Sequence, residues 1–145
     1  MSKSQTKFPP IIQWTPDCAL GLPQIDGEHE RFFSLLEGLH QALLQGKAKP
    51  VLDHLLTEMI DYTRYHFEHE EELMRRMRYP GYREHVREHE KLRSKTHDLA
   101  DRFSRGEITI TIATMQFLAD WLKRHRSMDR RFGDYAAMRG VSVAP

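Results

Sequence analysis

The feature that most restricts how this chain can fold is a repeated pairing of ionisable residues at helical spacing. His66 is followed by Glu70, and His85 is followed by His89. A step of four residues turns an α-helix by about 400°, so the two side chains of each pair point in nearly the same direction. Residues 79–81 read Tyr-Pro-Gly, and proline with glycine ends a helix and reverses the chain. We therefore predict a helical hairpin that gathers three imidazoles and one carboxylate, a donor set suited to iron or zinc.

The rest of the chain predicts further helices around this hairpin. Apolar residues recur at steps of three and four in four stretches, which is typical of helices with one buried face. Asp26 is a candidate N-cap for the first helix, and Pro50 suits the first turn of the second. Because the connections are short, we predict an all-α, up-down-up-down four-helix bundle.

Two flanking segments are predicted to lie outside the helices. Prolines break any helical period in residues 1–25, and this segment is too apolar for a loose tail, so we expect an N-terminal extended arm packed on the bundle. The bundle itself is predicted over residues 26–132. Gly133 and Gly140 punctuate a short C-terminal tail, residues 133–145.

Polar residues occupy positions where the predicted buried faces call for apolar side chains. Buried ionisable groups without partners would cost several kcal/mol each. Metal ions compensate such groups, and the set is too large for one tetrahedral zinc ion. Two metal ions bridged by carboxylates fit the set better. Its members are His29, His66, Glu70, His85, His89, His125 and Asp129.

Taken one at a time, these residues also have ordinary explanations. A single histidine such as His29 is more often a core residue than a ligand. His125 with Asp129 has the spacing of a surface ion pair, and Glu70 lies in an acidic run of a kind that usually faces solvent. The joint pattern favours a metal centre, because all four helices contribute to it on their buried faces. The other histidines are interpreted as surface groups or as groups behind the ligands: His40, His54, His69 and His97.

Composition argues against several other kinds of site. Cys18 is the one cysteine among 145 residues, so we expect neither a disulfide framework nor thiolate-bound zinc or iron–sulfur clusters. The net charge of +1 argues against a nucleic-acid partner. No apolar run reaches membrane-spanning length and no signal-peptide core is visible, so we expect no membrane partner and a cytoplasmic location.

Several short motifs occur together between residues 14 and 135. They combine the candidate ligands with aromatic and turn residues, and they are Trp14 with Gly21, Ile25-Asp26-x-x-His29, His66-Phe67-x-x-Glu70-Glu71, Tyr79-Pro80-Gly81, His85-x-x-x-His89 and Trp121-Leu122-x-x-His125. In this combination the sequence resembles the hemerythrins, and is closest to single-domain bacteriohemerythrins. The resemblance implies a four-helix bundle with a non-haem di-iron centre that binds O2 reversibly.

The resemblance implies two irons with unequal sets of histidines. His85, His89 and His125 are expected to bind one iron. His29 and His66 are expected to bind the other, which leaves a vacant position there for O2. The implied ligand is therefore O2, and an oxygen-consuming enzyme is a candidate partner. The oligomeric state stays open.

The resemblance also implies that Glu70 and Asp129 bridge the two irons, together with an oxo or hydroxo group. In the family the last histidine and the aspartate usually stand five residues apart, whereas His125 and Asp129 are four apart. A four-residue step aligns two side chains on a regular helix, so Asp129 remains the expected bridge. Asp134 is a distant substitute.

An apolar pocket for O2 is expected beside the second iron. Its expected lining is Phe33, Leu118, Trp121 and Leu122. The family has a bulky aliphatic residue directly after the last histidine, and this chain has Arg126. Two placements are open for Arg126. It either turns to the surface or lies beside the pocket, where its charge would change oxygen affinity or autoxidation.

Two other functions stay open beside reversible O2 binding. A di-iron enzyme acting on O2, peroxide or nitric oxide is one of them. Ferritin-like di-iron enzymes carry two Glu-x-x-His motifs, and this chain has only Glu37-x-x-His40. A module that senses O2 or redox state is the other. The sequence displays no signalling segment, so a stand-alone O2-binding protein is the favoured interpretation.

Overall fold

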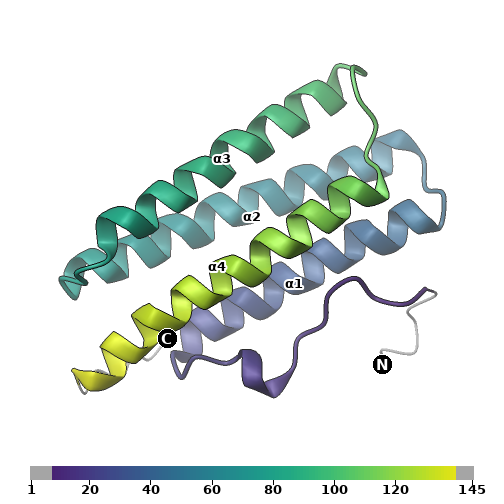
Figure 1. Cartoon of the computed structure of the whole chain (residues 1–145). Helices are drawn as coiled ribbons and strands as arrows, with labels where there is room; N and C mark the ends of the chain where they lie inside the picture. The colour runs from purple at the N-terminus through teal and green to yellow at the C-terminus, as the bar shows by residue number, and fades with distance from the viewer. Residues whose placement is uncertain (1–7, 140–145) are drawn as a thin grey trace.

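The computed structural model describes residues 8–139, so the first part of the predicted arm and the end of the predicted tail lie outside the described residues. Each long helix runs antiparallel to the one before it (Figure 1), as predicted for an all-α bundle. No helix in this range is both long and apolar enough to cross a membrane. The elements are the 3-10 turn η2 (Pro16–Cys18), α1 (Pro23–Leu44), α2 (Lys49–Arg76), α3 (Tyr82–Ser104) and α4 (Ile112–Met138).

The first helix begins at Pro23 rather than near Asp26, so the predicted start of the bundle at residue 26 is too late. A proline is accommodated in the first turn because the N–H it lacks has no helical partner there. Asp26 is not the N-cap. Its carboxylate accepts hydrogen bonds from the backbone N–H groups of Leu20 at 2.8 Å and Gly21 at 3.1 Å, and so fixes how the arm enters the helix.

The last helix is longer than predicted. The tail was expected from Gly133 onward, but α4 continues to Met138. Gly133 lies inside the helix where the arm passes close by, since a Cβ atom there would stand 3.3 Å from both the Cβ and the carbonyl oxygen of Leu20. At the other end Thr111 is the N-cap, and its hydroxyl accepts a hydrogen bond from the backbone N–H of Thr114 at 3.2 Å.

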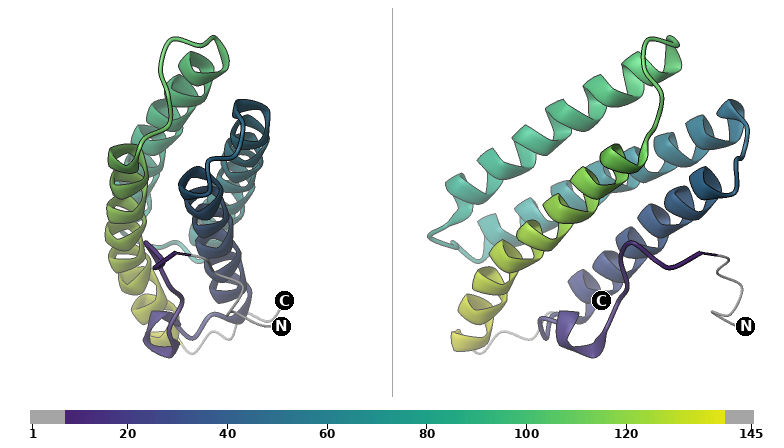
Figure 2. Two further views of the ribbon diagram at one scale, coloured as in Figure 1. Left: turned by 90° about the vertical axis from the view of Figure 1, so that its right-hand side faces the viewer. Right: turned by 45° about the vertical axis from the view of Figure 1, so that its right-hand side comes forward.

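The described part of the arm lies along α1 and reaches α4 (Figures 1 and 2). The Glu37 carboxylate accepts hydrogen bonds from the backbone N–H groups of Ile11 at 2.9 Å and Ile12 at 3.3 Å. The ring of Trp14 packs edge-on against Phe33, with centroids 5.4 Å apart. Side chains of α1 therefore hold the extended stretch of the arm that precedes η2.

Two apolar clusters fill the bundle, and a polar layer separates them. Along α1, Ile25 belongs to one cluster and Phe32 to the other. Along α4, Phe132 and Leu122 are divided in the same way. The buried residues between these pairs are predicted ligands together with Glu28, so apolar packing encloses this polar layer from both directions along the bundle.

Candidate metal centre

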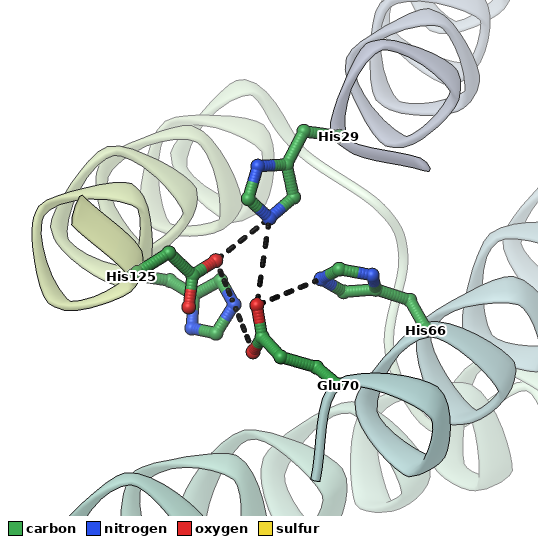
Figure 3. Close-up of side chains that lie close together, drawn as sticks. His29, His66, Glu70 and His125 are labelled. Atoms are coloured by element: carbon green, nitrogen blue, oxygen red, sulfur yellow. Dashed lines mark ion pairs between the residues drawn. The ribbon is translucent and has the colours of Figure 1, made fainter. Parts of the chain in front are cut away.

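Each of the four helices brings predicted ligands to one level of the bundle. In α2 and α3 the four-residue step places both members of a pair on one face. Figure 3 shows how His29, His66, Glu70 and His125 converge from three different helices. All predicted ligands are buried, with at most 2% of any one exposed, and they are His29 of α1, His66 and Glu70 of α2, His85 and His89 of α3, and His125 and Asp129 of α4.

Glu70 lies between two groups of histidines, of which Figure 3 draws His29, His66 and His125. One of its carboxylate oxygens faces three imidazoles, and the other faces two. A carboxylate that directs its two oxygens to different sets of donors has the arrangement of a bridge between two cations. The distances to the imidazole Nε2 atoms are 3.1 Å for His85 and His89 and 3.6 Å for His125 from Oε1, and 3.9 Å for His29 and His66 from Oε2.

Asp129 is the second carboxylate that faces both groups. Its Oδ2 lies 2.9 Å from Nε2 of His125, so the four-residue spacing brings the two side chains together on α4. The same Oδ2 lies 2.7 Å from Nε2 of His29, and Oδ1 lies 2.8 Å from Nε2 of His85. Asp134, the possible substitute, is exposed. Asp129 is therefore the carboxylate of α4 that reaches the site.

The ligand atoms form two overlapping groups that could each hold a metal ion. Within each group the atoms lie within 4.8 Å of one another. One group is His29, His66, Glu70, His125 and Asp129, and the other is Glu70, His85, His89, His125 and Asp129.

The same residues leave buried polar atoms without hydrogen-bond partners. Among the described residues, every buried side-chain nitrogen or oxygen atom in this condition belongs to the seven predicted ligands. They include both carboxylate oxygens of Glu70 and Asp129 and the Nε2 atoms of all five histidines. Unpaired buried polar atoms are costly, and a cation at their centre would satisfy them together. The donor set therefore fits a pair of transition-metal ions.

The carboxylates and imidazoles of the site shift one another's pKa values. Burial and the nearby Asp129 carboxylate favour the neutral form of Glu70, but neighbouring imidazoles outweigh them and lower its pKa to about 2. Burial disfavours the charged form of His85, yet the two carboxylates beside it raise its pKa to about 10. For His125 burial prevails over the carboxylates and lowers the pKa to about 4. Two carboxylates that stay ionised make the pocket attractive to cations.

Behind His66 stands Glu28, a residue that was not predicted to take part. Glu28 is only 6% exposed. Nδ1 of His66 lies 2.7 Å from Oε1 of Glu28, so Nδ1–H donates to the carboxylate and the lone pair of Nε2 faces the site. The other oxygen, Oε2, lies 2.5 Å from Nδ1 of His69. His69 is therefore a group behind a ligand, one of the two interpretations that the sequence left open.

Glu71 does for His89 what Glu28 does for His66. Nδ1 of His89 lies 2.7 Å from Oε2 of Glu71, and the same oxygen lies 3.0 Å from Nη2 of Arg93. Both carboxylates adjoin a ligand in the sequence. Adjacent residues of a helix point about 100° apart, so sequence position does not reveal that each carboxylate faces a ligand of another helix. The acidic run around Glu70 resembled a solvated face because its sequence does not show that Glu71 contacts His89 of α3.

The residues predicted to line an O2 pocket are all buried, with Phe33, Leu118, Trp121 and Leu122 between 1% and 7% exposed. Trp121 stacks on His125, with ring centroids 4.7 Å apart and planes 12° apart. Such packing fixes the imidazole plane and surrounds the site with apolar atoms. Their role as a lining for O2 stays a prediction.

Arg126 turns toward the arm. Its Nη1 donates to the Sγ atom of Cys18 at 2.7 Å, and its side chain is half-buried. Together with Phe33 it lines a cavity of about 320 Å³ beside the arm. Arg126 therefore lies neither free on the surface nor among the ligands of the metal centre.

The remaining histidines lie away from the ligand atoms. His54 and His97 are exposed, as one of the two predictions for them has it. His40 is buried, and its Nδ1 lies 3.3 Å from Oε2 of Glu37. Since Glu37 also holds the backbone of the arm, the single Glu-x-x-His motif of the chain is engaged in anchoring that segment.

Comparison with known proteins gives consistent results. The profile described as "Hemerythrin HHE cation binding domain" matches residues 20–131. A bacteriohemerythrin of Stenotrophomonas maltophilia is 33% identical over 126 residues, which cover 86% of this chain and 80% of that protein. A bacteriohemerythrin of Methylococcus capsulatus is 31% identical over 125 residues, which cover 85% and 95%.

Solved structures agree with the sequence matches. A crystal structure of wild-type hemerythrin superposes with a TM-score of 0.81 at 27% identity, covering 86% of this chain and 96% of that one. A crystal structure of a hemerythrin mutant gives a TM-score of 0.82 at 26% identity and covers 87% and 97%. The profile match spans most of the chain and includes every predicted ligand. The chain therefore belongs to the hemerythrin family.

Proposed function

We propose that the protein binds O2 reversibly at a di-iron centre held by five histidines and two bridging carboxylates. Two ferrous ions supply the two electrons that O2 can take up and give back. One iron would be held by His85, His89 and His125, and the other by His29 and His66. The carboxylates would serve both irons.

The observation that carries this proposal is the unequal division of imidazoles around Glu70. Three Nε2 atoms lie within 3.6 Å of Oε1, and two lie 3.9 Å from Oε2. Nε2 of His125 is close to both groups, and we assign it to the larger one because it faces the same Glu70 oxygen as His85 and His89. The iron with two histidines then has fewer protein ligands, and an exogenous molecule can complete its coordination.

The surrounding residues support binding without chemical conversion. The apolar clusters above and below the polar layer exclude water from the site. Five neutral imidazoles and only two carboxylates leave two ferrous ions with more positive charge than a carboxylate-rich set does, which favours the ferrous state. The Nδ1–H groups of His66 and His89 donate to carboxylates and so keep their Nε2 lone pairs directed to metal.

A di-iron enzyme is the second candidate, and one observation weakens it. Ferritin-like enzymes draw two Glu-x-x-His motifs into the metal site. The one motif of this type here, Glu37 with His40, holds the arm instead. We propose O2 as the ligand, and an oxygen-consuming enzyme as the recipient of that O2.

The test is anaerobic loading with ferrous iron, followed by cycles of exposure to O2 and to argon. We expect two irons per chain, a visible absorption band that appears with O2, and its loss under argon with the O2 recovered. Asp129→Ala is expected to abolish the stable oxygenated band, because it removes one bridge. Asp134→Ala removes an exposed carboxylate from the same helix and is the matched control.

Other outcomes decide against reversible binding. Continuous consumption of O2 with a reductant, or turnover of peroxide or nitric oxide, would identify an enzyme. An Asp134→Ala protein that loses the band while Asp129→Ala keeps it would reassign the bridge. Failure of the unmodified chain to hold iron would refute the di-iron proposal altogether.

A further inference from the structure

Arg93 contacts both of the groups that hold the ring of His89 in place. Its Nη2 atom lies 3.0 Å from Oε2 of Glu71, and its guanidinium carbon lies 5.3 Å from the centroid of the Phe67 ring. Phe67 lies flat on His89, with centroids 3.8 Å apart and planes 4° apart. One side chain, a single turn beyond His89 on α3, therefore touches both the hydrogen-bond acceptor and the stacking partner of one ligand.

The oxygen that accepts from His89 is the oxygen that Arg93 binds. Oε2 of Glu71 lies 2.7 Å from Nδ1 of His89 and 3.0 Å from Nη2 of Arg93. Nη1 of Arg93 lies 2.8 Å from Oε2 of Glu90, so the guanidinium is held from both sides. A guanidinium on a carboxylate oxygen withdraws electron density from it, and that oxygen then accepts less strongly from a second donor.

The carboxylate behind the other group of histidines lacks such a cation. Within residues 8–139, the ion-pair partners of Glu28 are two imidazoles, those of His66 and His69. Glu28 uses separate oxygens for its two partners, Oε1 for His66 and Oε2 for His69, whereas Oε2 of Glu71 serves both His89 and a permanent cation. The two groups of histidines therefore differ in the surroundings of the carboxylate behind each group, and not only in the number of their imidazoles.

We propose that Arg93 is a positioning residue that weakens the hydrogen bond from His89 to Glu71 and thereby raises the reduction potential of the iron on His89. This inference rests on the proposed di-iron function. A strong bond from Nδ1–H to a carboxylate makes an imidazole a better electron donor, and a better donor favours the ferric ion. By weakening that bond, Arg93 favours the ferrous ion, the form that can bind O2.

Two substitutions with opposite predicted signs test this role. Arg93→Gln frees Glu71 to accept more strongly from His89, so the midpoint potential of the loaded protein should fall. Glu71→Gln replaces the carboxylate by a weaker, neutral acceptor, so the potential should rise. Arg102→Gln removes a half-exposed guanidinium from the same helix and should leave the potential unchanged. Spectroelectrochemical titration of each iron-loaded variant measures the potential.

A variant that carries both Arg93→Gln and Glu71→Gln separates an effect of Arg93 through Glu71 from a direct through-space effect of the Arg93 charge on the iron. If Arg93 acts through Glu71, Arg93→Gln lowers the potential in the unmodified protein and has no effect in the Glu71→Gln background. An equal fall in both backgrounds overturns the proposal, as does a change of the same sign in both single variants. Arg93→Lys keeps the charge near Glu71 and should restore most of the potential.

A second measurement does not need iron or O2. In the zinc-loaded protein, the Nδ1–H proton of His89 should move downfield in the NMR spectrum of Arg93→Gln and upfield in that of Glu71→Gln. An unmodified chain that holds iron but consumes O2 would refute reversible binding and still leave both shifts to decide the role of Arg93. Unchanged proton shifts and potentials in a reversibly oxygenated protein would refute the role of Arg93 alone.

Discussion

Single carboxylates decide which nitrogen of a histidine faces the metal centre. A neutral imidazole carries one proton, and a hydrogen bond at Nδ1 leaves Nε2 free to bind metal. Glu28 provides that hydrogen bond for His66, and Glu71 provides it for His89. These carboxylates would therefore act on a bound metal through its ligands without touching it.

Replacing Glu28 by glutamine should weaken metal binding by about 10–100-fold, because the amide no longer holds His66 in one tautomer and orientation. Titration of ferrous iron against a competing chelator under argon measures the affinity. Glu30→Gln removes an exposed carboxylate from the same helix and should leave the affinity unchanged. Equal losses in the two variants would mean that the effect comes from general charge and not from His66.

Metal affinity should rise with pH between about 6.5 and 10. The raised pKa of His85, about 10, means that the folded metal-free protein holds a proton there which a metal ion must displace. Each proton that binding displaces strengthens the apparent affinity about tenfold for each pH unit in this window.

The same shift has a consequence for stability. A pKa raised above the unfolded value of 6.5 gives stability that is complete below pH 6.5 and is lost as the pH rises through about 10. Chemical unfolding of the metal-free protein should therefore reveal weakening over this range. His85→Gln should reduce this dependence, and the exposed His54→Gln should not alter it.

At the level of residues, the sequence predicted which candidate ligands the fold brings together but not what supports them. Ligands such as His29 and Asp129 interrupt an apolar stripe, which makes them visible in a single helix. The roles of Glu28 and Arg93 depend on residues far away in the chain, and no local pattern distinguishes them from solvated charges. Arg126 was undecided because its partner, Cys18, lies in the arm, more than 100 residues earlier in the chain.

Helix α4 illustrates how packing between elements overrides a local signal. Alanine is favoured over glycine inside an exposed helix by about 1 kcal/mol. Gly38→Ala in α1 meets no atom within 4 Å and should stabilise the protein by about that amount. Gly133→Ala places its Cβ 3.3 Å from Leu20, so the gain should be smaller or reversed.

A larger side chain at Gly133 should release the arm. Gly133→Leu is expected to cost about 1–3 kcal/mol through overpacking against Leu20. Urea unfolding measures the loss, and faster proteolytic cleavage before Pro23 would localise it to the arm. An arm that stays protected in this variant would contradict the close approach at Gly133.

The existence of the four long helices could be predicted from the periodicity of their apolar residues. Apolar steps and turn residues identified every long helix, because those signals are local. The ends were less accurate. Helix α1 begins at Pro23, and Asp26 binds the incoming arm instead of capping the helix. At Gly133 the missing side chain leaves room for the arm, so this glycine does not mark the end of α4. Both corrections involve contacts between the arm and a helix, and these are tertiary.

For the whole molecule, a metal bound at the candidate site would cross-link the four helices at the level where the apolar core is interrupted. Each helix contributes at least one candidate ligand, and the carboxylate oxygens and imidazole Nε2 atoms that face one another in this layer have no hydrogen-bond partners among the described residues. A ligand at 1,000 times its dissociation constant stabilises a folded protein by about 4 kcal/mol.

Removal of the metal with a chelator should therefore lower Tm by about 10 °C in a protein of this size. Calorimetry before and after chelation, and again after ferrous iron is returned, measures the change. Equal Tm values in the two states would contradict a metal-linked bundle. The up-down order of the helices could be predicted from the short connections, whereas the strength of this linkage could not.

The chain has two tryptophans, and their positions make them natural optical probes. Trp121 stacks on the candidate ligand His125, while Trp14 belongs to the arm and packs against Phe33 of α1. Light emission from Trp121 should be quenched when iron enters, because the indole lies next to the coordinating ring. A Trp121→Phe substitution isolates the emission of Trp14, which should change when the arm detaches from α1. Fluorescence can therefore follow iron loading and arm release as separate events.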